Sequence, residues 1–157
     1  MPRLLLAATA LAALARPSPA KADVGLGLFV GEPFGLDLKI DLQRRAALDL
    51  VLGVTTVRDG RADYGHLTYL VTPVVGRGRS VLVPLRLGLG VALFDGGGDF
   101  GDEVNVAVRA PLQLGFVLRR TPLELYAEVA FKLLLVDGND NQRTTDLDGG
   151  VGFRLLF

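Results

Sequence analysis

The sequence predicts an all-β protein: an eight-stranded antiparallel up-and-down barrel that crosses a membrane, preceded by a cleaved signal peptide. Three observations support this fold class. A short apolar run stands near the N-terminus. The rest of the chain alternates apolar and polar residues with a period of two, which is typical of strands. One face of that alternation is nearly pure in apolar residues, whereas the other carries charges and glycines.

The first 22 residues have the pattern of a signal peptide. Arg3 is followed by an apolar run of 12 residues, Leu4 to Ala15, which is too short for a membrane-spanning helix. Ala20 and Ala22 form a small-x-small cleavage site, so we expect cleavage before Asp23. The alternative is a buried N-terminal helix, with which the Pro-rich stretch before the cleavage site is less consistent.

The predicted mature chain, residues 23–157, has 135 residues and the size of one domain. Without Arg3, Arg16 and Lys21 it has 14 basic and 17 acidic residues, a net charge of −3. This balance gives no reason to expect a nucleic-acid partner. The absence of cysteine excludes disulfides, thiol catalysis, Cys-zinc sites and a lipidated cysteine. No cofactor or metal ligand set is predicted.

Eight segments carry the strand alternation, and most have about the 9–11 residues that a tilted membrane-spanning strand needs. They are residues 23–31, 35–42, 46–54, 64–73, 81–94, 104–118, 123–135 and 147–157. Pro84 and Pro111 fall inside two of them. Each proline removes a hydrogen-bond donor from the sheet, so we expect a bulge or other irregularity near each.

The composition of the two faces predicts which one points outward. A soluble barrel or sandwich also alternates, but it places its apolar residues inside. Here the polar face carries charges of both signs among glycines, which leave room for long side chains in a narrow lumen. On a lipid-facing surface a basic residue would cost roughly 2–4 kcal/mol at the bilayer midplane. We therefore expect the apolar face outside and predict these lumen charges: Asp37, Lys39, Asp41, Asp49, Arg86, Arg109, Glu124, Glu128, Lys132, Asp148 and Arg154.

The lumen charges have two interpretations. Nearly equal numbers of the two signs in a tight space favour a salt-bridged plug that holds a narrow barrel together, since buried charges are costly unless they are paired. The alternative is a path for protons or ions.

The connections predict an orientation, because an even number of strands places both termini on the periplasmic side. The predicted periplasmic turns are 43–45, 74–80 and 119–121, and they carry six arginines. The predicted outer loops are 32–35, 55–63, 95–103 and 136–146, and they are rich in Asp and Glu. The acidic loops are either ordinary solvated loops or sites that share divalent cations with anionic lipid headgroups.

Two further patterns are candidate sites. Residues 95–103 and 137–141 resemble oxygen-rich calcium loops, but neither has the full spacing with its closing Glu, and turn chemistry explains the same residues. Some lipid-modifying barrel enzymes use a His–Ser pair. The only histidine, His66, and the only serine of the mature chain, Ser80, are expected at opposite ends of the barrel, beyond the roughly 3 Å of a nucleophile–base contact. The sequence therefore predicts no enzyme.

Four motifs carry a resemblance to a known family. They are Gly31-Glu32-Pro33-Phe34-Gly35-Leu36-Asp37-Leu38-Lys39, Val108-Arg109-Ala110-Pro111-Leu112, Pro122-Leu123-Glu124-Leu125-Tyr126-Ala127-Glu128 and Leu147-Asp148-Gly149-Gly150-Val151-Gly152-Phe153. With them, residues 23–157 resemble small eight-stranded outer-membrane barrels of the OmpA/OmpX type, and more narrowly a poorly characterised group of OmpA-like barrels. The chain departs from that type in lacking tryptophan.

The resemblance implies a protein of the Gram-negative cell envelope that is inserted into the outer membrane. Its partners would be outer-membrane lipid and, during insertion, the barrel-assembly machinery, with Phe153, Leu155 and Phe157 as the assembly signal. It carries over no catalytic residue. We expect a structural or surface-interaction role with a closed polar lumen and acidic outer loops whose external ligand is unknown. The alternatives are a narrow pore or small-ligand transport barrel and, disfavoured, a lipid-modifying enzyme.

Overall fold

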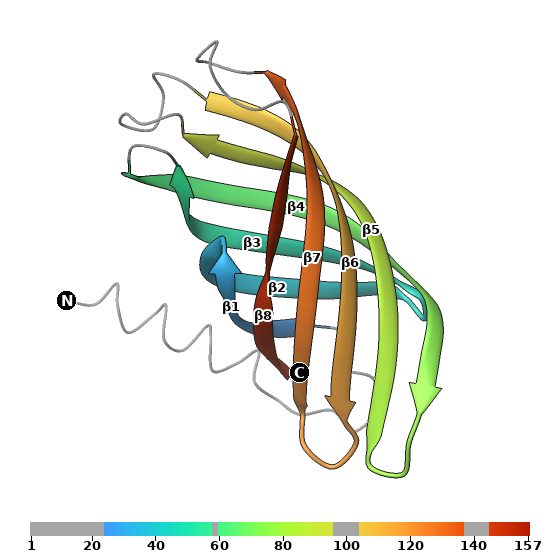
Figure 1. Cartoon of the computed structure of the whole chain (residues 1–157). Coiled ribbons are helices and arrows are strands. Elements are labelled where there is room, and N and C mark those ends of the chain that lie inside the picture. The colour runs from blue at the N-terminus through green and yellow to red at the C-terminus, as the bar shows by residue number, and fades with distance from the viewer. Residues whose placement is uncertain (1–23, 58–59, 96–103, 137–144) are drawn as a thin grey trace, which may run out of the picture.

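The protein is a closed barrel of eight antiparallel strands, which confirms the predicted fold class at this level (Figure 1). This computed structural model describes residues 24–57, 60–95, 104–136 and 145–157. The strands are β1 (Val24–Glu32), β2 (Phe34–Gln43), β3 (Ala46–Val57), β4 (Gly60–Arg77), β5 (Val81–Asp95), β6 (Val104–Leu118), β7 (Leu123–Val136) and β8 (Thr145–Leu156). The predicted signal peptide lies outside the described residues.

Each strand pairs with the next along the chain, and pairing of β1 with β8 closes the barrel. In that last pair Leu28 lies opposite Phe153, and the Phe157 amide donates a 2.9 Å hydrogen bond to the Val24 carbonyl. Closure gives each of the eight described strands a neighbour on both sides, so none of them is an edge strand. No helix among the described residues is long and apolar enough to cross a membrane.

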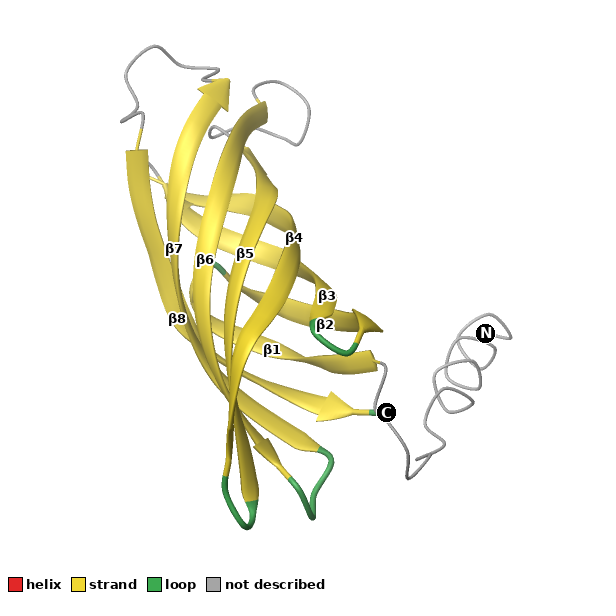
Figure 2. Cartoon of the chain, turned by 90° about the vertical axis from the view of Figure 1, so that its right-hand side faces the viewer, coloured by secondary structure: helices red, strands yellow, loops and turns green. Residues whose placement is uncertain are grey.

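The connections lie at two ends of the barrel, which we call the turn end and the loop end. The turn end carries the β2–β3, β4–β5 and β6–β7 connections, all short and drawn in green in Figure 2. The loop end carries the β1–β2, β3–β4, β5–β6 and β7–β8 connections. The strands differ in length from the 9 residues of β1 to the 18 residues of β4, so one wall of the barrel is taller than the other (Figure 1).

Two predicted connections were wrong, both because strands continue through them. Residues 55–63 were expected to form a loop, but β3 runs to Val57 and β4 begins at Gly60, with Thr55 paired to Ala62. Residues 74–80 were expected to form a turn, but β4 runs on to Arg77. Both segments are rich in β-branched Val and Thr, which fit a strand. The remaining strand bounds agree with the prediction to within about three residues.

Pro84 and Pro111 interrupt the pairing between β5 and β6 without shifting its register. The pairs Leu82–Val117, Leu85–Leu114 and Gly90–Arg109 keep one register, while no pair forms at either proline. Each proline ring instead packs against a glycine: a Cβ at Gly88 would lie 2.9 Å from the Pro111 ring, and one at Gly115 would lie 2.9 Å from Pro84. The expected irregularities are therefore gaps in pairing. Bulges occur elsewhere, one of them in β4 between Val71 and Val74.

The apolar face of every strand points outward. All eight strands contribute large apolar side chains that are exposed, such as Leu36 on β2, Leu89 on β5 and Val151 on β8. The interior holds buried charged and polar side chains instead. This is the predicted arrangement, and it is the reverse of a soluble barrel.

Candidate functional site

The polar interior is the candidate site, because it gathers most of the charged residues of the strands. The structure buries ten of the eleven predicted lumen charges, with at most 6% of each residue exposed. The exception is Asp41, whose side chain is 34% exposed at the turn end and lies 3.3 Å from the Lys39 ammonium. The members come from β2, β3, β5, β6, β7 and β8, so their contacts cross the lumen.

Arg154 on β8 is the centre of the network. Its Nε donates to Asp37 Oδ2 at 2.6 Å, and its Nη2 donates to Asp49 Oδ1 at 2.6 Å. Its Nη1 lies 3.7 Å from Glu124 Oε2. The same guanidinium stacks 3.9 Å from the ring centre of Tyr126, whose hydroxyl donates to Asp37. One fully buried cation therefore balances carboxylates from three other strands.

A second cluster continues from Glu124 toward the wall formed by β5 and β6. Glu124 accepts from Arg86 and lies 3.3 Å from the Lys39 ammonium. Arg86 also donates to Gln113 Oε1 at 2.9 Å, and Gln113 donates to Glu128 at 3.1 Å.

Arg109 extends this cluster to β4. It donates to Glu128 at 2.5 Å and to the Thr68 hydroxyl at 2.9 Å. Hydrogen bonds and ion pairs between side chains thus connect seven strands, β2 to β8, in one network across the lumen. The remaining strand, β1, contributes Phe29, which stacks on Tyr126 with ring centres 6.0 Å apart, and Glu32, which accepts a 2.9 Å hydrogen bond from Thr55 on β3.

Glycines make this packing possible at two positions, as the sequence predicted. A Cβ at Gly152 would collide with the ring of Tyr126. A Cβ at Gly115 would lie 2.8 Å from a Glu124 carboxylate oxygen and 3.0 Å from an Arg86 nitrogen. Any larger residue at either place would push the paired groups apart.

The lumen toward the loop end is different, with fewer charges and more aromatic rings. Lys132 lies 2.8 Å from Asp148 and 3.3 Å from Asp146, and its ammonium stands 5.2 Å from the centre of the Phe94 ring. Tyr64 stacks on Phe94 with ring centres 6.4 Å apart. This part of the interior is a mixed aromatic and ionic layer.

The structure places His66 and Ser80 apart, as the sequence predicted. His66 is buried within β4, where its Nδ1 lies 3.3 Å from the Tyr64 hydroxyl. Ser80 is exposed at the turn end, and its carbonyl accepts a hydrogen bond from the Arg119 amide. The two residues thus lie in different environments at different heights of the barrel. The proposed calcium loops lie outside the described residues, apart from Asp95 at the end of β5.

The turn end opens into a cavity of about 280 Å³. Its lining includes Lys39, Asp41, Arg44, Pro84 and Arg86. Next to this cavity, Glu124 contacts both Lys39 and Arg86, and these contacts cross the lumen. Within the part of the chain that the structure describes, no group of three or more His, Cys, Asp or Glu residues could hold a metal ion.

Sequence reasoning missed the neutral members of the network. Gln113, Thr68, Tyr126 and Tyr64 are all buried, and Gln113 bridges Arg86 to Glu128. Each stands an even number of residues from a charged inward residue on its own strand or from His66. The parity of the alternation therefore places these neutral residues on the inward face, and it is the signal in the sequence that identifies them.

No protein-family model, curated protein or solved structure matches the chain.

Proposed function

We propose that the protein is a small outer-membrane barrel whose strands span the lipid bilayer and whose role is structural or surface-interacting. The observation that carries the proposal is the continuous apolar outer surface. Side chains such as Leu52, Leu89 and Val151 are more than half exposed on three different strands. Monomeric soluble proteins rarely expose contiguous apolar patches larger than a few hundred Å². Lipid is a partner that covers such a belt on all sides of a closed barrel.

In this proposal residues 1–22 are a signal peptide, and the chain belongs with the small OmpA/OmpX-like barrels of Gram-negative bacteria. Export delivers it to the periplasm, and the barrel-assembly machinery inserts it. Phe153 and Leu155 on β8 face outward, which is consistent with an assembly signal on that strand. The turn end then faces the periplasm and the loop end faces the outside.

The interior supports a closed barrel rather than a pore. Ion pairs and hydrogen bonds from seven strands meet across the lumen at the level of Arg154 and Arg109. Opening a path there would leave several buried charges unpaired, and each broken buried pair is strongly destabilising. An enzymatic role has no support from the His66 surroundings.

Cell fractionation followed by heat-modifiability tests the location. The expected result is a band in the outer-membrane fraction that migrates differently when boiled and unboiled, because a folded membrane barrel resists unfolding in the unboiled sample. A single band in the soluble periplasmic fraction would contradict the proposal.

Planar-bilayer recording tests the closed lumen. We expect no defined single-channel steps from the wild-type protein. We expect steps to appear in an Arg154→Ala/Glu124→Ala variant that still shows the heat-modifiable band. Regular single-channel steps from the wild-type protein would contradict the structural role and indicate a pore.

A further inference from the structure

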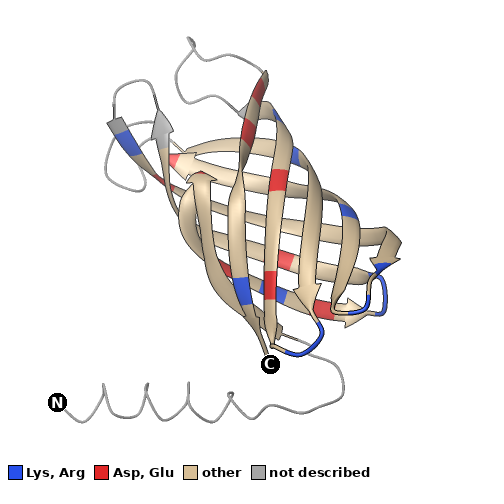
Figure 3. Ribbon diagram, turned by 60° about the horizontal axis from the view of Figure 1, so that its bottom comes forward, with Lys and Arg blue, Asp and Glu red and all other residues tan. Residues whose placement is uncertain are grey.

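The two ends of the barrel carry opposite charge, and the turn end is the more uniform. Its three connections hold six arginines, all exposed, which we call the arginine collar: Arg44, Arg45, Arg77, Arg79, Arg119 and Arg120. Figure 3 shows these basic residues in blue on the turns. None of the six forms an ion pair with another residue that the structure describes.

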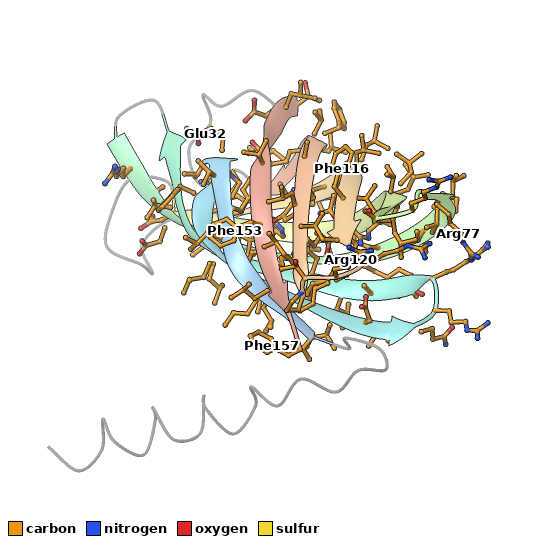
Figure 4. The ribbon with its side chains drawn as sticks, turned by 90° about the horizontal axis from the view of Figure 1, so that it is seen from below. Glu32, Arg77, Phe116, Arg120, Phe153 and Phe157 are labelled. Carbon is orange, nitrogen blue, oxygen red and sulfur yellow. The ribbon has the colours of Figure 1, made fainter. Side chains whose placement is uncertain are left out.

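Two acidic side chains of the strands near the turn end, the partly exposed Asp41 and the buried Glu124, are already engaged by Lys39. Asp41 and Glu124 both lie 3.3 Å from the Lys39 ammonium. The collar therefore presents positive charge to its surroundings. The loop end differs, since its strands carry Glu32, Asp63 and Asp146 beside Arg61. In Figure 4 Arg77 and Glu32 lie on opposite sides of the view.

The collar lies beside the exposed apolar side chains of the outer face, the apolar belt, at the turn end of the barrel. Leu42 and Val74 stand two and three residues before the first arginines of their turns, and they are 50% and 58% exposed. Phe116, three residues before Arg119, is 41% exposed. A long basic side chain at such an edge keeps its stem against apolar surface and extends its charged head to the interface.

We propose that the arginine collar binds the anionic headgroups of phospholipids in the leaflet at the turn end. This inference rests on the proposed membrane insertion. Guanidinium groups match phosphate with two parallel hydrogen bonds, and basic residues beside a bilayer are attracted to anionic lipid. The three turns lie on one rim, so a single leaflet reaches all of them at once. A soluble anionic partner would not require the collar to follow the edge of the apolar belt.

The test compares phosphatidylglycerol with phosphatidylcholine. The folded full-length protein in neutral detergent receives equal amounts of both lipids, and native mass spectrometry counts the lipids that remain bound. We expect at least about tenfold enrichment of phosphatidylglycerol, falling as salt is added. Substitution of all six arginines by glutamine should bring the ratio close to one. Asp63→Asn/Asp146→Asn, at the loop end, is the matched control and should keep the enrichment.

Four further variants keep the test decisive. If the six-fold variant does not fold, three double variants replace it, one for each turn, and each should lose part of the enrichment. Arg→Lys at all six positions should retain more enrichment than Arg→Gln, because it keeps the charge and loses the bidentate geometry.

The outcomes separate this inference from the proposed function. Insertion of the wild type into phosphatidylcholine vesicles is measured on the same preparation. Insertion with equal binding of the two lipids would overturn the collar proposal and leave membrane insertion standing. Enrichment that survives the glutamine substitutions would also overturn it. Failure to insert into vesicles of either lipid would overturn both.

Discussion

The inner and outer faces of the same eight strands differ in what holds them in place. The inner face depends on partners: Arg154, Glu124 and Glu128 are almost fully buried, and each is engaged by residues of other strands. The apolar side chains of the described outer face, such as Leu89 and Val151, are presented to the surroundings instead. We therefore expect the stability of the barrel to fall when a charge is removed from the inner face, and to fall when a charge is added to the outer face. This difference orders the following predictions.

The largest effect is expected from Arg154→Met. The substitution leaves Asp37 and Asp49 buried without their cation, and breaking a buried pair in this way costs about 3–5 kcal/mol. Urea unfolding of the barrel in lipid vesicles, followed by circular dichroism, measures the loss in free energy of unfolding. Arg61→Met is the matched control, because Arg61 is exposed, and it should change stability by no more than about 0.5 kcal/mol. Equal losses would show that the network does not stabilise the barrel.

The second effect is expected from a charge added to the outer face. Leu89 stands near the middle of β5 and is 64% exposed. Leu89→Arg should cost about 2–4 kcal/mol in a bilayer, as for arginine at the midplane. Val74→Arg, on the outer face near the turn end of β4, should cost only about 0–1 kcal/mol because it lies at the interface. If both variants unfold like wild type in vesicles, the outer face does not contact hydrocarbon.

A smaller effect inside the barrel is expected from Tyr126→Phe. The ring keeps its stack with Phe29 and its place against Gly152, but the hydroxyl that donates to Asp37 is lost. Asp37 Oδ2 keeps its hydrogen bond from Arg154 Nε, so the expected cost is that of one hydrogen bond to a charged group, about 1.5–3 kcal/mol. The same unfolding assay should show almost no change for Tyr69→Phe, since Tyr69 is exposed on the outer face. Similar losses at the two tyrosines would contradict the role of the Asp37 hydrogen bond.

The smallest effect is expected from Asp146→Asn. Asp146 lies 3.3 Å from Lys132 with its side chain 66% exposed, and exposed ion pairs contribute only about 0–1 kcal/mol. Asp148→Asn should cost more, because Asp148 is 2.8 Å from the same ammonium and its side chain is 5% exposed. A larger loss at Asp146 than at Asp148 would show that burial does not set the strength of these pairs.

The alternation of side chains made most of the fold predictable. A period of two identifies the strands, and it also assigns each side chain to the inner or the outer face. Strand ends were less predictable where β-branched residues continue the pattern, as at Thr55 and Val74. Which inward residues meet was not predictable. Arg154 contacts Asp37 and Asp49 from two non-neighbouring strands, and these contacts depend on the stagger of the closed barrel. The odd or even position of a residue in its strand predicts the face on which it lies, but it does not predict the stagger between strands.

The most direct test of the central claim places single labels on the outer face. The chain has no cysteine, so Leu89→Cys and Val151→Cys each carry one fluorophore, on β5 and β8. Ser80→Cys labels the exposed β4–β5 turn as the control. In vesicles that contain brominated lipid chains, we predict strong quenching at Leu89 and Val151 and weak quenching at Ser80. Quenching of all three labels by aqueous iodide, with none by brominated lipid, would contradict membrane insertion of the barrel.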